Sequence, residues 1–168
     1  MPPIATIALV CAALFTGAAG YISLVEHPVR LGMEDAPMLA QWQPSYSRAL
    51  PIQSGLAIAG GLSGIVSWYL SGDLFWLLGS VVLLANWPFT LLAIMPTNKR
   101  LKTMQPAQAN GKSRALLLSW GKLHNIRSAL GLISTMIFAW TMTTNPQALE
   151  TDRQTEILGE KLRPSHDR

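Results

Sequence analysis

Four long segments that are nearly free of charge constrain the fold of this chain more than any other feature. They cover residues 4–25, 49–70, 74–95 and about 115–142. An α-helix needs about 20 apolar residues to cross the roughly 30 Å hydrocarbon core of a bilayer. The sequence therefore predicts an all-α fold. It is a four-transmembrane-helix antiparallel bundle over residues 1–145, followed by a polar C-terminal tail over residues 146–168.

The composition supports a multi-pass integral membrane protein. Charged residues make up 13% of the chain, about half of the roughly 25% that is usual in soluble domains. The net charge is +4, but no basic stripe with interleaved aromatic residues is present, so we expect membrane lipids and no nucleic acid as partners. The single cysteine, Cys11, excludes an internal disulfide and a cysteine-based zinc site.

Polar residues gather at one end of the predicted bundle. In an up-down bundle, the ends of the first and third segments lie beside the beginnings of the second and fourth. The first segment ends in "SLVEHP", with Glu26 and His27, and the third ends in "MPTNKRL", with Asn98. The connection before the second segment contains Trp42 and Tyr46. The opposite end has nothing comparable, so we expect one functional site at this end.

The fourth segment carries polar residues where hydrocarbon is expected, in "SWGKLHNIR". Trp120, His124 and Arg127 are spaced i, i+4 and i+7, and therefore share one helix face. Counting back from the end of the segment at about 1.5 Å per residue puts Arg127 about 8 Å inside the near edge of the hydrocarbon. An ionisable residue at this depth indicates function and needs a partner. The Glu26 carboxylate and the Asn98 amide are the expected candidates.

A proline interrupts the third segment. Pro88 predicts a kink in this helix and leaves one backbone carbonyl without its usual donor. Asn86, in "LANWP", is expected to hydrogen bond to the freed carbonyl. A catalytic role for this amide is the alternative interpretation.

Three motifs taken together resemble the DUF1772 family, which includes the fungal anthrone oxygenases of aromatic polyketide pathways. They are "AGYISLVEHP", "MPTNKRL" and "WGKLHNIRSALGL", and the resemblance covers about residues 8–142. It implies a small four-helix membrane protein that oxidises an anthrone with O2 to an anthraquinone, without an organic cofactor. For a fungal chain it implies the endoplasmic reticulum. The motif positions imply site residues at His27, Asn98, Trp120, His124 and Arg127.

These residue types suit that chemistry. An anthrone has acidic methylene hydrogens, and its anion reacts directly with O2. Imidazole, with an ordinary pKa of about 6.5, suits the base. A cation or amide donor suits the developing oxyanion, and tryptophan rings suit a planar polycycle. Such an apolar substrate would reach the site from the bilayer.

The resulting hypothesis gives each residue a role. His124 is the base and His27 a second base or an orienting group, although the reverse assignment of the two histidines stays open. Arg127 and Asn98 stabilise the oxyanion. The expected substrate-binding residues are Trp120, Trp42, Tyr46 and Glu26.

Two other functions are compatible with the sequence. His27, His124 and Glu26 could form a facial triad for iron, or bind copper. No HxxxH or ExxH spacing supports this alternative, so the main hypothesis has no resident metal and only O2 as co-substrate. The second alternative is a non-enzymatic protein that binds lipid or a quinone.

Overall fold

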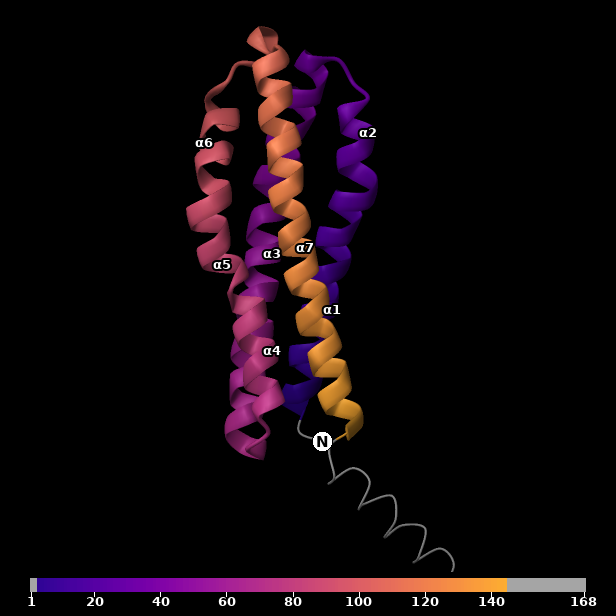
Figure 1. Cartoon of the computed structure of the whole chain (residues 1–168), viewed down its shortest axis with the longest axis vertical. Coiled ribbons are helices and arrows are strands. Elements are labelled where there is room, and N and C mark those ends of the chain that lie inside the picture. The colour runs from indigo at the N-terminus through magenta and orange to yellow at the C-terminus, as the bar shows by residue number, and fades with distance from the viewer. Residues whose placement is uncertain (1–2, 145–168) are drawn as a thin grey trace, which may run out of the picture.

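The computed structural model describes residues 3–144, which form four long helical rods (Figure 1). The tail predicted over residues 146–168 lies outside the described residues. The first rod consists of α1 (Pro3–Tyr21), a π-helical turn η1 (Ile22–Glu26) and α2 (His27–Leu31). The second rod is α3 (Asp35–Ser71). The third consists of α4 (Leu74–Leu84), α5 (Asn86–Phe89), a π-helical turn η2 (Thr90–Ile94) and α6 (Met95–Thr103). A short turn, η3 (Pro106–Gln108), leads to the fourth rod, α7 (Gly111–Thr144).

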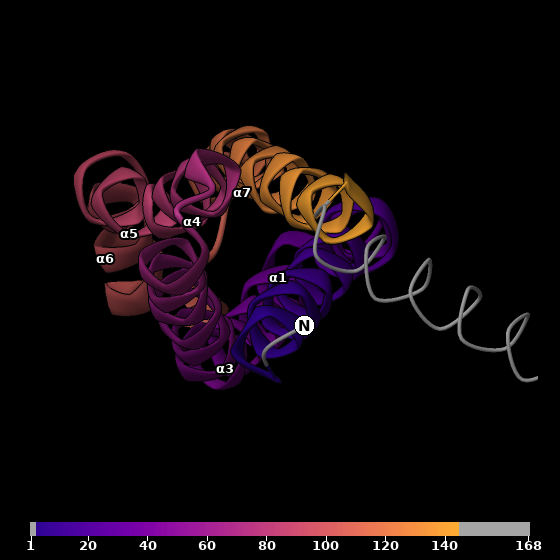
Figure 2. The ribbon, with the colours of Figure 1, turned by 90° about the horizontal axis from the view of Figure 1, so that it is seen from below.

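The rods form an antiparallel bundle. Seen along its axis, α1 lies between α3 and α7, and α4 lies between the same two helices on the other side (Figure 2). Residues 3–144 contain helices and no strand, and four helices are long and apolar enough to cross a membrane. The predicted all-α four-helix fold is therefore confirmed.

The rods extend beyond the apolar segments at the end where the polar motifs gather. Helix α3 has 37 residues and begins at Asp35, so Trp42 and Tyr46 lie within a helix instead of in a connection. The helix continues because Met38, Leu39 and Trp42 recur on one face and are completely buried. At about 1.5 Å per residue, α3 is roughly 55 Å long, well over the hydrocarbon thickness.

Exposed apolar side chains mark the part of the bundle that hydrocarbon covers. On α3 they run from Ile52 to Leu70, and on α7 they run from Leu118 to Trp140, with Lys122 and Asn125 also exposed near the upper end of that stretch. These stretches correspond to about 27 and 33 Å of helix, close to the thickness of a bilayer core. The end of the bundle that carries Trp42 and Tyr46 therefore lies at one face of the membrane.

Two π-helical turns precede the polar ends of the first and third rods. The His27 amide donates to the Ile22 carbonyl, and the Met95 amide donates to the Thr90 carbonyl. Pro28 follows one turn and Pro96 the other. Proline has no N–H to continue the α-helical pattern, and a wider turn adjusts the backbone before it. Each turn also changes the direction in which the following side chains point.

The predicted kink in the third rod is present. Helix α4 ends at Leu84 and α5 begins at Asn86, two residues before Pro88. The Asn86 side-chain amide donates to the carbonyl of Leu83 at 3.0 Å. Its acceptor is one residue before Leu84, the residue whose carbonyl the proline leaves without an α-helical donor. The expected bond from Asn86 to the carbonyl that Pro88 frees is therefore wrong by one residue, because the side chain reaches back to i−3 and not to i−2.

The buried apolar residues form two clusters along the bundle. The membrane-centre cluster comprises Ala5, Ala8, Ala12, Phe15, Ala19, Ala57, Trp76, Leu83 and Phe138. The upper cluster comprises Ile22, Met38, Leu39, Trp42, Tyr46, Ile94, Leu101, Leu117 and Trp120. Arg127 lies at the edge of the membrane-centre cluster, where its guanidinium carbon is 5.6 Å from the centre of the Phe15 ring.

Candidate functional site

An aromatic cluster in the upper part of the bundle brings together residues from three helices. Trp120 on α7 has its ring centre 5.3 Å from that of His27 and 4.7 Å from that of His124. Trp42 on α3 meets Trp120 edge-on at 5.8 Å and stacks on Tyr46 at 4.9 Å. All five side chains are buried. The sequence hypothesis selected each of them, and the fold places them in one cluster.

His124 is held by hydroxyl groups on one side of its ring. Its Nδ1 lies 3.1 Å from the Ser23 hydroxyl oxygen, which is also 2.8 Å from the hydroxyl oxygen of Ser128. The ring is stacked on Trp120 at an interplanar angle of 28°. These contacts fix the orientation of the imidazole. Because Nδ1 is hydrogen bonded to Ser23, Nε2 is the ring nitrogen available to a ligand. Sequence reasoning missed Ser23, whose polar side chain sits in an otherwise apolar stretch.

Glu26 pairs within its own rod and with α3, and the expected pair with Arg127 is wrong. One carboxylate oxygen accepts from Arg30 Nη2 at 2.5 Å, from Gln41 at 3.0 Å and from Ser45 at 2.5 Å. Arg30 also donates to Gln41, and only 1% of its side-chain surface is exposed. Counting residues gave Glu26 a suitable depth, but its i, i+4 spacing to Arg30 puts a nearer cation on the same face.

The Glu26 pair should matter for stability. We expect Glu26→Leu to lower the free energy of unfolding by about 3 kcal/mol, because it leaves the buried Arg30 guanidinium without a counter-charge. Chemical denaturation in detergent measures this loss. The double variant Glu26→Leu with Arg30→Met should recover most of it, since both charges are then absent. A double variant as unstable as Glu26→Leu would contradict the ion-pair interpretation.

Neither partner expected for Arg127 is in place. The two salt bridges among residues 3–144 join Arg30 to Glu26 and Arg114 to Asp35. The Asn98 amide donates instead to the Tyr46 hydroxyl, at 2.8 Å. Arg127 is 5% exposed, and its Nε has no hydrogen-bond partner in the described part of the chain. A buried cation is costly without a partner, which indicates that a ligand supplies the missing charge or acceptor.

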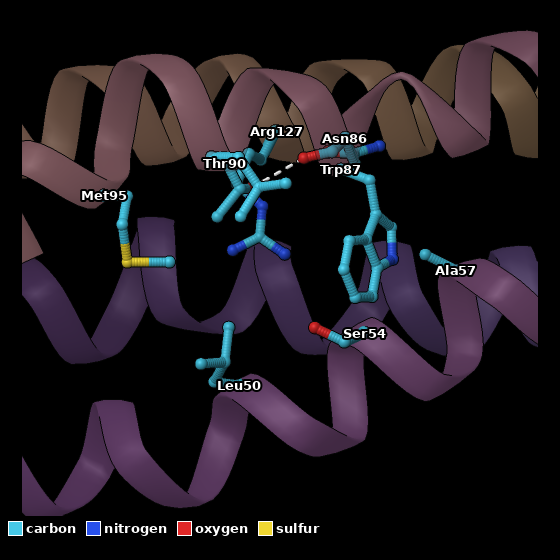
Figure 3. Close-up of a pocket in the computed structure, with 9 residues that line it drawn as sticks. Leu50, Ser54, Ala57, Asn86, Trp87, Thr90, Met95 and Arg127 are labelled. Carbon is cyan, nitrogen blue, oxygen red and sulfur yellow. Dashed lines mark hydrogen bonds between the residues drawn. The ribbon is translucent and has the colours of Figure 1, made fainter.

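Arg127 lies where two hollow spaces meet. A cavity of about 210 Å³ contains its guanidinium (Figure 3) and is lined by Leu50, Ser54, Ala57, Asn86, Trp87, Thr90, Leu91, Met95 and Arg127. A narrow cleft of about 10 Å³ is lined by Ile22, Arg30, Trp42, Ser45, Tyr46, Ala49, Leu50, Gln53, Trp120, His124 and Arg127. Leu50 and Arg127 belong to both. The cavity is the larger space, and sequence reasoning missed it because the break at α5 and the turn η2 create one wall.

Several buried nitrogen atoms beside the cleft are unpaired. Four nitrogen atoms have no hydrogen-bond partner among the described residues: His27 Nδ1, Trp42 Nε1, Trp120 Nε1 and Arg127 Nε. Buried polar groups in folded proteins are nearly always paired with protein or water. Such a concentration at one place therefore indicates a site that accepts a polar ligand atom.

The histidines do not form a metal-binding group with a carboxylate. Within residues 3–144, no three side chains of His, Cys, Asp or Glu come together as ligands for one ion. Glu26 is occupied by Arg30, Gln41 and Ser45. The facial triad of Glu26, His27 and His124 is therefore not assembled.

The chain is similar to known proteins over most of its length. A family described as "Anthrone oxygenase" matches residues 42–137. "Anthrone oxygenase" from Claviceps purpurea is 28% identical over 145 residues, which cover 78% of this chain and 83% of that protein. "Anthrone oxygenase dmxR16" from Cryptosporiopsis sp. is 28% identical over 134 residues, covering 74% and 77%. "Anthrone oxygenase tpcL" from Aspergillus fumigatus is 38% identical over 64 residues, covering 36% and 40%.

No solved structure matches the chain. The family match alone covers more than half of its residues and begins at Trp42. It includes the third rod and most of the second and fourth rods, together with His124 and Arg127. The resemblance seen in the three sequence motifs is therefore confirmed, and the chain belongs to the anthrone oxygenase family of oxygenase-like enzymes.

Proposed function

We propose that the protein is a membrane-embedded oxygenase that oxidises an anthrone-type aromatic polyketide with O2 to the anthraquinone. The observation that carries this proposal is Arg127, a buried cation without an acidic partner in the described residues, beside a cleft that contains His124. An anionic intermediate is the kind of species that such a cation stabilises. The names of the three relatives, each an anthrone oxygenase, support an anthrone as substrate.

The proposed reaction begins with proton removal. His124 Nε2 accepts a proton from the methylene carbon, and the carbanion charge spreads over the rings and the oxygen beside Arg127. One electron then passes from the anion to O2, and the carbon radical and superoxide combine to form a C–O bond. The peroxide takes up a proton, the remaining methylene proton leaves, and the O–O bond breaks. One CH2 group and one O2 thus become one C=O group and one water.

The other site residues have supporting roles in this proposal. His27 lies against Trp120 and outside the lining of the cleft, which favours an orienting role for it and the base role for His124. Asn98 donates to the Tyr46 hydroxyl, so it is proposed to position Tyr46 instead of contacting the oxyanion. The ring of Trp42 stacks on Tyr46 and lines the cleft, where it can contact the part of the substrate that reaches toward His124.

The reaction as proposed needs O2 as co-substrate and no organic cofactor. The test is oxygen uptake by detergent-purified protein given an anthrone, with and without EDTA. Uptake well above the spontaneous rate that persists in EDTA supports the proposal. Uptake that EDTA abolishes would indicate a metal held by the histidines, and uptake at the spontaneous rate would contradict the anthrone as substrate. For a fungal chain we place the enzyme in the endoplasmic reticulum membrane.

Gly121 provides a test of the His27 position. A Cβ atom at residue 121 would overlap the His27 ring at Nε2, so only glycine leaves room for the imidazole. We expect Gly121→Ala to displace His27 and to lower the rate of oxygen uptake at least about tenfold, since small misplacements at a site are costly. Oxygen uptake and the unfolding temperature are measured together.

The matched control is Gly17→Ala. Gly17 is also within a helix, and a Cβ there would meet nothing within 4 Å. This control should keep its activity. Full activity in Gly121→Ala would contradict a role for the His27 ring at its present position.

A further inference from the structure

The 210 Å³ cavity opens toward the hydrocarbon. It lies between α3 and the kinked third rod (Figure 3). Its lining includes two partly exposed side chains, Trp87, 39% exposed, and Leu91, 52% exposed. Leu91 lies within the exposed apolar surface that runs along this rod from Leu74 to Leu92. A molecule dissolved in the bilayer can therefore enter the cavity without crossing water.

One cationic group projects into this otherwise mostly apolar space. The Arg127 side chain extends from α7, and its terminal nitrogens point toward Leu50 and Ser54 on α3 (Figure 3). The other polar lining groups include Thr90, whose hydroxyl already donates to the Asn86 carbonyl at 2.6 Å. A ligand that fits is thus largely apolar and has one anionic or strongly accepting oxygen.

The lining of the cavity argues against a phospholipid headgroup as that ligand. Leu50, Ala57, Trp87, Leu91 and Met95 surround the guanidinium with apolar groups. Lys122, five residues before Arg127 on α7, is exposed and offers a phosphate a cation at the surface. We therefore expect the accepting oxygen to belong to a molecule that itself partitions into hydrocarbon.

The size of the cavity fits a molecule of more than one ring. An apolar protein cavity of about 150 Å³ accommodates benzene. The cavity beside Arg127 is about 210 Å³ and is open on one side, so further rings can extend toward the lipid. The cleft that contains His124 is about 10 Å³ and holds no substrate by itself.

We propose that this cavity, and not the aromatic cluster, is the binding chamber for the polycyclic substrate, which enters sideways from the bilayer between α3 and the kinked third rod. This inference rests on the proposed function. The rings lie between Leu50, Ser54 and Trp87, and the reacting part of the substrate extends past Arg127 toward His124. Leu50 and Arg127 line both spaces and form the passage between them.

A substitution that fills the cavity tests the proposal. Ser54→Leu adds bulk inside the chamber, and Ala59→Leu adds bulk to an exposed position of the same helix. Both variants are reconstituted in lipid nanodiscs. For each we measure binding of the unreactive anthraquinone by quenching of tryptophan fluorescence, and the KM for the anthrone by oxygen uptake. We expect at least a tenfold weaker binding and a tenfold higher KM for Ser54→Leu, and values within twofold of the wild type for Ala59→Leu.

A second pair of variants tests the entrance independently. Leu91→Trp adds bulk at the opening, whereas the neighbouring Leu92, 79% exposed, does not line the cavity. Leu91→Trp should lower kcat/KM at least about fivefold, and Leu92→Trp should leave it unchanged.

The outcomes separate this inference from the proposed function. Wild-type binding and KM in Ser54→Leu, together with a wild-type kcat/KM in Leu91→Trp, would overturn the chamber and leave the cavity to a lipid acyl chain. The oxygenase proposal would then still stand on wild-type turnover. If the wild type consumes no oxygen with an anthrone, yet binds the anthraquinone in a way that Ser54→Leu abolishes, the substrate assignment fails and the chamber stands.

Discussion

His124→Ala should lower the kcat of anthrone oxidation by a factor of about 10² to 10⁴, the usual contribution of a positioned general base. The imidazole is the only titratable group on α7 that lines the cleft besides Arg127, and its Nδ1 is fixed by Ser23 at 3.1 Å. Without it, water must take the methylene proton. Oxygen uptake at saturating substrate measures the effect, and anthraquinone binding shows whether the site remains intact.

Comparison variants decide between the two histidines. His27→Ala should cost less activity than His124→Ala, because His27 contacts Trp120 but does not line the cleft. Ser23→Ala should have a smaller effect, since it removes an orienting contact and leaves the base in place. A larger loss in His27→Ala than in His124→Ala would reverse the assignment that the sequence alone left open.

The position of the polar end of the bundle could be predicted from segment lengths. Up-down connectivity alone places His27, Trp120 and Asn98 at one end, and the i, i+4 spacing of Trp120 and His124 gives their common face. The structure confirms both the four-helix fold and this convergence. Local spacing and chain direction are enough for such inferences.

The pairing of charges could not be predicted in the same way. Depth counting gives the height of a residue in the membrane but not the direction in which its side chain points around the helix axis. Glu26 and Arg127 have suitable heights, yet Glu26 faces Arg30, Gln41 and Ser45. The cavity could not be predicted from the sequence either. It depends on a break at Ala85 and on a π-helical turn at Thr90–Ile94, which change the register of the third rod.

Arg127→Met should lower kcat/KM by a factor of about 10² to 10³, comparable to the loss of one oxyanion-stabilising donor at other active sites. Methionine has a similar length, but it offers no charge to the substrate anion and loses the cation–π contact with the Phe15 ring. Arg127→Lys should recover part of the loss, because it keeps the charge but not the planar array of donors. Single-turnover oxygen consumption in nanodiscs measures these effects.

Stability distinguishes this functional role from a structural one. Arg127 has no acidic partner among the described residues, so replacing a buried, unpaired cation by methionine should keep or raise the unfolding temperature. Arg30→Met is the matched control, because Arg30 is equally buried but paired, and its loss leaves Glu26 without its cation. It should lower the unfolding temperature. An inactive Arg127→Met that is also strongly destabilised would mean that the guanidinium holds the bundle together, whereas an inactive and stable variant would mean that its partner is the substrate.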